Sequence, residues 1–245
     1  MNVLGEPELW IAMGAVCAGG VIRGFSGFGA AMLVVPILSI LYLPHQAVAI
    51  AMCLALVANI QLVPGALRST EWRQALPLSI GALAGIPLGA LALLNIDPDL
   101  MRRAISAIVL AFALLLLSGW RWRGRQGLPA ALLAGSMAGV INGAAGTGGP
   151  PVILYLLAGP RSAETSRANI ISVYLFLNGG TLASLAVNGV ISPEVMWRAL
   201  LLAPAWVLSL WIGIRMFHTA SDRIYRRIAL LTLVGVGLFG LFYTR

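Results

Sequence analysis

Two glycine-rich segments decide the fold of this chain. Residues 20–29 read GVIRGFSGFG, and residues 139–148, 119 positions later, read GVINGAAGTG. Six of the aligned positions are identical, and four of these are glycines. Glycine lets a backbone turn back on itself without steric cost, and a helix broken inside lipid is tolerated where its freed backbone groups line a cavity. Paired breaks in two halves of an apolar chain therefore point to the binding site of a transporter.

The composition is that of a helical membrane protein. The 245 residues are 60% hydrophobic and only 10% charged, whereas about 25% of residues are charged in an ordinary soluble domain. A transmembrane β-barrel would alternate polar and apolar residues along segments of about 10 residues, and this chain has continuous apolar runs. We therefore predict an all-α polytopic protein embedded in a lipid bilayer.

The positive charge of the chain has a topological explanation. The formal net charge of +8 comes from sixteen arginines, with no lysine. Nucleic-acid binding is the first hypothesis for so basic a chain, but the arginines lie in short loops between apolar runs, as in membrane proteins. No nucleic-acid partner is expected. Cys17 and Cys53 lie inside apolar runs and predict small buried side chains, not a disulfide or metal pair. A Walker A loop needs a lysine, so we expect no ATP hydrolysis by that route. No cofactor is expected.

The duplication extends over the whole chain. Trp72-Arg73 corresponds to Trp197-Arg198, and Arg102-Arg103 corresponds to Arg226-Arg227. We predict two repeats, 1–119 and 128–245, joined by a basic cytoplasmic linker at 120–127. Each repeat comprises a glycine-tipped hairpin and three transmembrane spans. These are 9–43, 47–66, 75–94 and 101–119 in the first repeat, and 128–159, 168–188, 196–217 and 224–243 in the second.

The arginines distinguish two topologies. If each glycine region were one broken span, the loops would divide the arginines other than Arg23 seven against eight. If each glycine region instead enters and leaves the membrane on the same side, eleven arginines lie on one side of the membrane. The other side then has only Arg102, Arg103, Arg198 and Arg245. The second division satisfies the positive-inside rule. It predicts hairpins, two inverted repeats and periplasmic termini.

The hairpins are predicted to be broken or re-entrant. Residues 9–23 would form a helix of about 22 Å at 1.5 Å per residue, which is shorter than a hydrocarbon core of about 30 Å. The returning arm at 150–159 is shorter still and begins with Pro150-Pro151.

The hairpin tips carry the candidate binding residues. A helix that starts inside the membrane directs unpaired N–H groups and partial positive charge at its tip, which favours an anion. The returning arms are predicted to start near Gly29 and Pro150, and Arg23 is the only basic residue in the hairpin apolar stretches. The predicted substrate-binding residues are Arg23, Ser26, Gly27, Gly29, Asn59, Asn142, Gly146, Thr147, Gly148 and Asn178.

Several of these residues have a structural alternative. Arg23 could extend to the cytoplasmic interface from the end of a short span. Asn59 and Asn178, also 119 positions apart, could be interhelical hydrogen-bonding residues or part of a cavity wall. Close packing of small residues is the preferred interpretation of Gly135 and Gly139. It is not preferred for the denser cluster of Gly143, Gly146, Gly148 and Gly149.

An enzymatic function is not expected. Gly24-Phe25-Ser26-Gly27 matches the G-x-S-G pattern of rhomboid-type intramembrane proteases, whose serine needs a histidine base within reach. His45 and His218 both lie at loop edges, and the second repeat has Ala145 at the position of Ser26. No carboxylate lies deep in a span, so the usual relay for protons or sodium ions is also not expected.

With both motifs in view, the chain resembles the TauE/SafE sulfite exporter family over almost its whole length. The second copy, GAAGTGGPP at 143–151, is close to the family pattern, and TEWR at 70–73 is a further similarity. The first copy has Ala30 where a further glycine is common. The resemblance implies a bacterial inner-membrane permease for a small sulfur-containing anion such as sulfite or an organosulfonate.

Two other functions and the oligomeric state stay open. An anion channel could use the same hairpins without alternating access. A transport-inactive scaffold would not need paired helix breaks. A homo-oligomer is compatible with the sequence.

Overall fold

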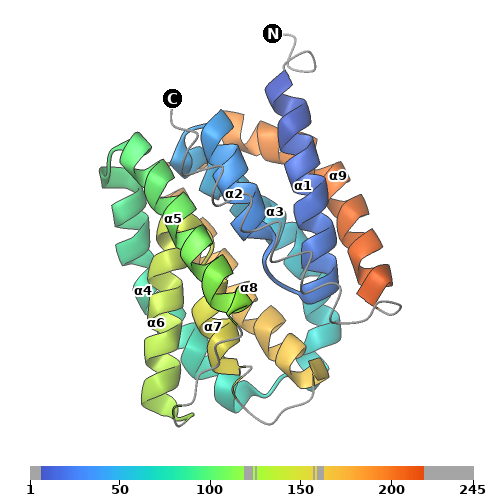
Figure 1. Ribbon diagram of the computed structural model, residues 1–245, viewed down its shortest axis with the longest axis vertical. Helices are drawn as coiled ribbons and strands as arrows, with labels where there is room; N and C mark the ends of the chain where they lie inside the picture. The colour runs from blue at the N-terminus through green and yellow to red at the C-terminus, as the bar shows by residue number, and fades with distance from the viewer. Residues whose placement is uncertain (1–6, 119–123, 125, 157, 159–162, 218–245) are drawn as a thin grey trace.

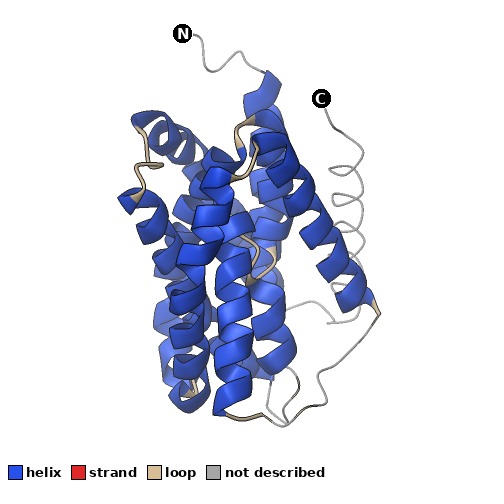
Figure 2. Cartoon of the chain, turned by 90° about the vertical axis from the view of Figure 1, so that its left-hand side faces the viewer, coloured by secondary structure: helices blue, strands red, loops and turns tan. Residues whose placement is uncertain are grey.

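The computed structural model describes residues 7–118, 124, 126–156, 158 and 163–217. In these residues the chain forms a bundle of α-helices and one short 3₁₀ helix (Figures 1 and 2). The elements are α1 (Pro7–Ser26), α2 (Ala30–Leu41), α3 (Pro44–Ala66), η2 (Leu67–Ser69), α4 (Trp72–Asn95), α5 (Pro98–Leu117), α6 (Leu128–Ala145), α7 (Gly149–Leu156), α8 (Ala163–Val187) and α9 (Pro193–Phe217).

The prediction of a helical polytopic membrane protein is confirmed. Six helices, α1, α3, α4, α6, α8 and α9, are long and apolar enough to cross a membrane. Their outer surfaces expose large apolar side chains such as Ile60, Leu88, Leu133 and Leu208, which suits contact with lipid better than contact with water. The predicted span at 224–243 and most of the linker at 120–127 lie outside the described residues.

Prolines explain where several helices begin. Pro44, Pro98 and Pro193 are the first residues of α3, α5 and α9, and Pro129 lies in the first turn of α6. Proline suits this position because the first N–H groups of a helix have no intrahelical partner and its fixed φ is already helical.

The first helix is longer than its apolar run. α1 has 20 residues, which is about 30 Å at 1.5 Å per residue and matches the hydrocarbon core of a bilayer. The prediction of a short first arm at 9–23 was wrong, because Gly24, Phe25 and Ser26 continue the helix beyond Arg23. The returning helix α7 has only 8 residues, as its short apolar run indicated.

Glycines let α4 and α6 pack backbone against backbone. A Cβ atom added at Gly85 would collide with the carbonyl oxygen of Ser136, and one added at Gly139 would collide with that of Ala82. We call this close contact between the backbones of two helices a glycine seam. It confirms the packing role predicted for Gly135 and Gly139. Gly143 belongs to it as well, since an added Cβ would collide with the Ile86 carbonyl oxygen. Close packing, which the sequence analysis did not prefer for Gly143, is therefore the correct interpretation of this glycine.

A second glycine seam joins α1 to α9. Cβ atoms added at Gly24 and Gly213 would collide with the carbonyl oxygens of Leu210 and Val21 respectively. α1 thus lies directly beside α9 on one side of the bundle, α4 lies beside α6 on the other, and α3 and α8 contact each other between them (Figure 1). Each repeated motif therefore has two parts. Its first two glycines pack in a seam, and its last two lie at a turn.

Candidate functional site

The turn between α1 and α2 depends on two glycines and one serine. Gly27 and Gly29 have φ of 79° and 85°, in the left-handed region that favours glycine. The Ser26 Oγ lies 2.7 Å from the carbonyl oxygens of both Ile22 and Phe28 and accepts the Phe28 N–H at 3.1 Å. These contacts use the hydroxyl of Ser26 to shape the turn.

The turn between α6 and α7 is stabilised by Asn142. Gly146 has φ of 65°, and the Gly148 N–H donates to Asn142 Oδ1 at 3.1 Å. Asn142 Nδ2 donates to Thr181 Oγ1 at 2.8 Å and to the Leu177 carbonyl oxygen at 3.2 Å. Both ends of the Asn142 amide are thus used inside the protein, where they tie this turn to α8.

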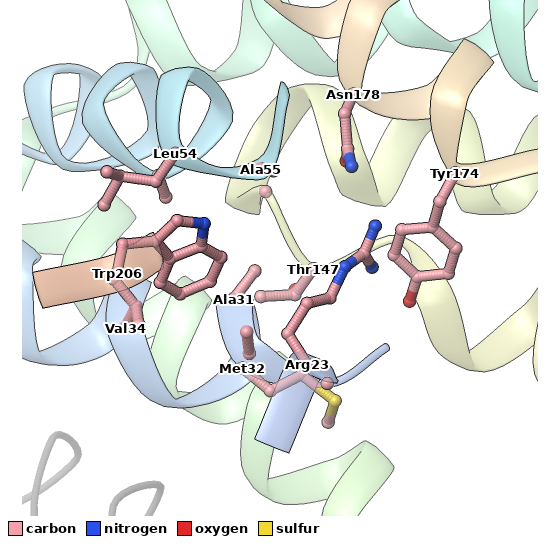
Figure 3. A pocket seen from close by; sticks show the side chains of 14 residues that line it. Arg23, Ala31, Met32, Val34, Leu54, Ala55, Thr147, Tyr174, Asn178 and Trp206 are labelled. Carbon is pink, nitrogen blue, oxygen red and sulfur yellow. The ribbon is translucent and has the colours of Figure 1, made fainter. Parts of the chain in front are cut away.

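A small cavity lies where the two turns approach each other. Gly29 from the first turn and Gly146 from the second both line it, together with residues of α1, α2, α3, α8 and α9. The cavity has a volume of about 20 Å³, enough for about one water molecule. Figure 3 shows the side chains of Arg23, Asn178 and Trp206 around this space, from three different helices, together with Thr147 from the turn between α6 and α7.

Arg23 is buried against this cavity without a balancing charge. Its side chain is 3% exposed, its Nη2 donates to Asn59 Oδ1 at 2.8 Å, and its guanidinium carbon lies 4.6 Å from the centroid of the Tyr174 ring. No carboxylate among the described residues pairs with it. A buried position inside the bundle does not fit an arginine that extends to the interface, and an uncompensated buried charge is costly.

Four buried donors around the cavity have no hydrogen-bond partner within the part of the chain that the structure describes. They are Arg23 Nε, Thr147 Oγ1, Asn178 Nδ2 and Trp206 Nε1, and each of the four side chains is at most 3% exposed. Native proteins leave few such groups unpaired, because each costs about 1–3 kcal/mol. A ligand that carries only acceptors and negative charge would satisfy all four.

The first turn of α2 adds to this environment. Ala30, Ala31 and Met32 line the cavity, and the N-cap residue Gly29 makes no side-chain capping hydrogen bond. The N-terminus of a helix carries partial positive charge and free N–H groups. It therefore reinforces the positive potential of Arg23.

The predicted site residues separate into two groups. Arg23, Gly29, Gly146, Thr147 and Asn178 line the cavity. The others lie behind it: Asn59 accepts a hydrogen bond from Arg23, and Ser26, Gly27, Asn142 and Gly148 form the turns.

Two aromatic lining residues that carry a polar atom, Tyr174 and Trp206, were absent from the sequence-based prediction. Tyr174 lies one helical turn before Asn178, and this spacing of four residues could have indicated a shared face of α8. Trp206 had no comparable signal, because its indole is one of seven in an apolar chain.

The other reactive groups form no second centre in the described part of the chain. Cys17 and Cys53 are both free thiols, and their side chains are half-buried, whereas buried side chains were predicted. No group of three metal-ligating side chains occurs among the described residues. His45 lies at the start of α3, and His218 is outside the described residues.

The fold and the cavity define a polytopic membrane protein with a donor-lined internal pocket, a class that includes transporters. The family model described as "Sulfite exporter TauE/SafE" matches residues 11–240, and the chain belongs to this family. It is 27% identical over 226 residues to the probable sulfite/organosulfonate exporter TauE of Cupriavidus necator, covering 90% of this chain and 88% of that protein. No solved structure matches.

Proposed function

We propose that this chain is a secondary transporter of the bacterial inner membrane. It carries a small sulfur-containing anion, such as sulfite or an organosulfonate, and binds it in the cavity between the two glycine turns. The observation that carries this proposal is the set of four unpartnered buried donors around one cavity, one of which belongs to an arginine that no carboxylate of the described residues neutralises. The family and the name of the Cupriavidus necator relative support the choice of substrate.

The chemistry of the donors suits a sulfur oxyanion. Sulfite and sulfonate groups present three oxygens that diverge from one sulfur atom, so they can accept hydrogen bonds from several sides at once. A guanidinium offers planar, paired donors to such oxygens, and hydrogen bonds between charged partners are stronger than neutral ones. Thr147 and Asn178 complete the polar side of the pocket, on the turn after α6 and on α8.

The helix packing supports two inverted repeats, 1–119 and 128–245. In the first seam Gly20 faces Trp206 and Ser209 while Gly24 faces Leu210, so α1 and α9 run parallel. In the second, Gly81 faces Leu132 and Gly89 faces Val140, so α4 and α6 also run parallel. In the duplication α1 corresponds to α6, and α4 corresponds to α9. Exchanging the two repeats therefore converts the α1–α9 pair into the α6–α4 pair. α1 and α6 start at opposite ends of the bundle in Figure 1, as an inversion requires.

The orientation in the membrane follows from the arginines. Arg68, Arg73 and Arg215 lie near the ends of α3, α4 and α9 that the positive-inside rule places in the cytoplasm. Reporter fusions after Gly127 should be cytoplasmic, and fusions after Ile96 or Arg245 should be periplasmic. A cytoplasmic C-terminus would refute the inverted arrangement.

Counterflow in proteoliposomes tests transport itself. A carrier that alternates between two sides should take up labelled sulfite faster when unlabelled sulfite is present inside, whereas acetate inside should have no such effect. Equal uptake with and without trans sulfite would favour an anion channel over a carrier. Absence of uptake, together with absence of sulfite binding to the purified protein, would reject the proposed function.

A further inference from the structure

Trp206 has a polar group that finds no hydrogen-bond partner among the described residues. It lies on α9, is 3% exposed and lines the same cavity as Arg23. Its Nε1 is buried without a hydrogen-bond partner, although the N–H of a buried tryptophan usually finds one. Nearby lining residues include Val34, Leu54 and Ala55, whose side chains offer no acceptor.

The close packing of α1 against α9 restricts the position of the Trp206 indole. A Cβ atom added at Gly19 would lie 3.5 Å from Trp206 Cζ3, and one added at Gly20 would lie 3.1 Å from the Trp206 carbonyl oxygen. α1 therefore packs directly against the residue, and this contact limits the movement of the ring. Figure 3 shows the indole across the cavity from the guanidinium of Arg23.

We propose that Trp206 is a specificity-determining residue whose indole N–H donates a hydrogen bond to an oxygen of the bound anion. This inference rests on the proposed anion site. An indole N–H can donate but cannot accept, and it approaches from the side opposite Arg23. A ligand that satisfies both groups must present acceptors in two directions. Sulfite and sulfonates do so, and their oxygens would connect α1 with α9. Chloride, a single small sphere, would satisfy the two groups less well.

Replacing Trp206 with phenylalanine tests this role, because it keeps an aromatic ring and removes the N–H. Trp206→Phe should weaken sulfite binding by about tenfold, the lower end of the range for one hydrogen bond to a charged group, and should weaken chloride binding less. The control is Trp197→Phe, which changes an exposed tryptophan of the same helix and should bind sulfite as the unaltered protein does. Titration calorimetry of the full-length purified protein gives both affinities.

A spectroscopic measurement makes the test independent of how the variant folds. Sulfite should shift the ultraviolet resonance Raman band that reports indole N–H hydrogen bonding in the unaltered protein and in Trp197→Phe. The shift should be absent in Trp206→Phe.

The outcomes separate this inference from the proposed function. If sulfite binds and Arg23→Gln weakens it, but Trp206→Phe binds equally well and no Raman shift occurs, the role of Trp206 is rejected and the anion site stands. If the unaltered protein binds no sulfite, the proposed function fails, and this inference fails with it.

Discussion

Arg23→Gln should weaken sulfite binding by about 1.5–3 kcal/mol, the typical contribution of a hydrogen bond to a charged group. Glutamine removes the charge but keeps an amide donor near the position of the arginine Nε, although it is too short to replace the Nη2 contact with Asn59. The thermal stability of the ligand-free protein should not fall, because the substitution removes a buried charge that no carboxylate balances. Loss of affinity without loss of stability is the signature of a binding residue.

Two further variants make this result specific. Arg23→Lys should recover only part of the affinity, since an ammonium lacks the planar donor fork. Arg198→Gln is the matched control, because Arg198 also lies over an aromatic ring, 4.2 Å from the centroid of Tyr42, but pairs with Glu194 at 2.6 Å. It does not line the cavity, so sulfite affinity should be unchanged. Equal affinity in the Arg23 variants and the unaltered protein would remove Arg23 from the site.

Gly146→Val should abolish transport while leaving the protein inserted in the membrane. Gly146 has φ of 65°, and a β-branched residue strongly resists this conformation. An added Cβ would lie 3.2 Å from both Met52 Cε and Val35 Cγ2, so the side chain would also crowd the packing of this turn against α2 and α3. Uptake of labelled sulfite into proteoliposomes measures the effect.

Gly189→Val is the control for backbone strain alone. Gly189 has φ of 72° and no atom within 4 Å of an added Cβ, and it lies in the turn between α8 and α9, away from the cavity. This variant should lose about 1–2 kcal/mol of stability, the cost of the left-handed conformation, and retain transport. If Gly146→Val also transports normally, the turn glycines have only a packing role.

The repeated glycine motif predicted the positions of both turns, because glycine clusters in an apolar chain mark helix breaks by local conformation alone. The motif could not show which glycine has which role. Gly143 and Gly146 are only three residues apart, yet one packs against α4 and the other adopts a left-handed φ. This difference depends on the neighbouring helix, and the local sequence does not contain that information.

For the candidate site, too, the sequence predicted some of the residues and could not predict others. Arg23 could be identified because a charged residue in an apolar stretch is costly and therefore conspicuous. Asn142 and Asn178 are the same residue type in similar apolar surroundings, but Asn142 is fully used by Gly148 and Thr181, while Asn178 Nδ2 faces the cavity without a partner. Trp206 could be recognised only from the fold, since its single polar atom is significant only where no acceptor lies nearby.

A crystal structure with bound selenite would show directly whether the anion binds in the cavity between the two glycine turns. Selenite has the pyramidal shape of sulfite, and its selenium atom can be located by anomalous scattering. The account predicts one selenium peak in the cavity, with selenite oxygens within hydrogen-bond distance of the Arg23 guanidinium and of the donors on Thr147, Asn178 and Trp206. A fully occupied selenite elsewhere in the membrane region, with this cavity empty, would contradict the account.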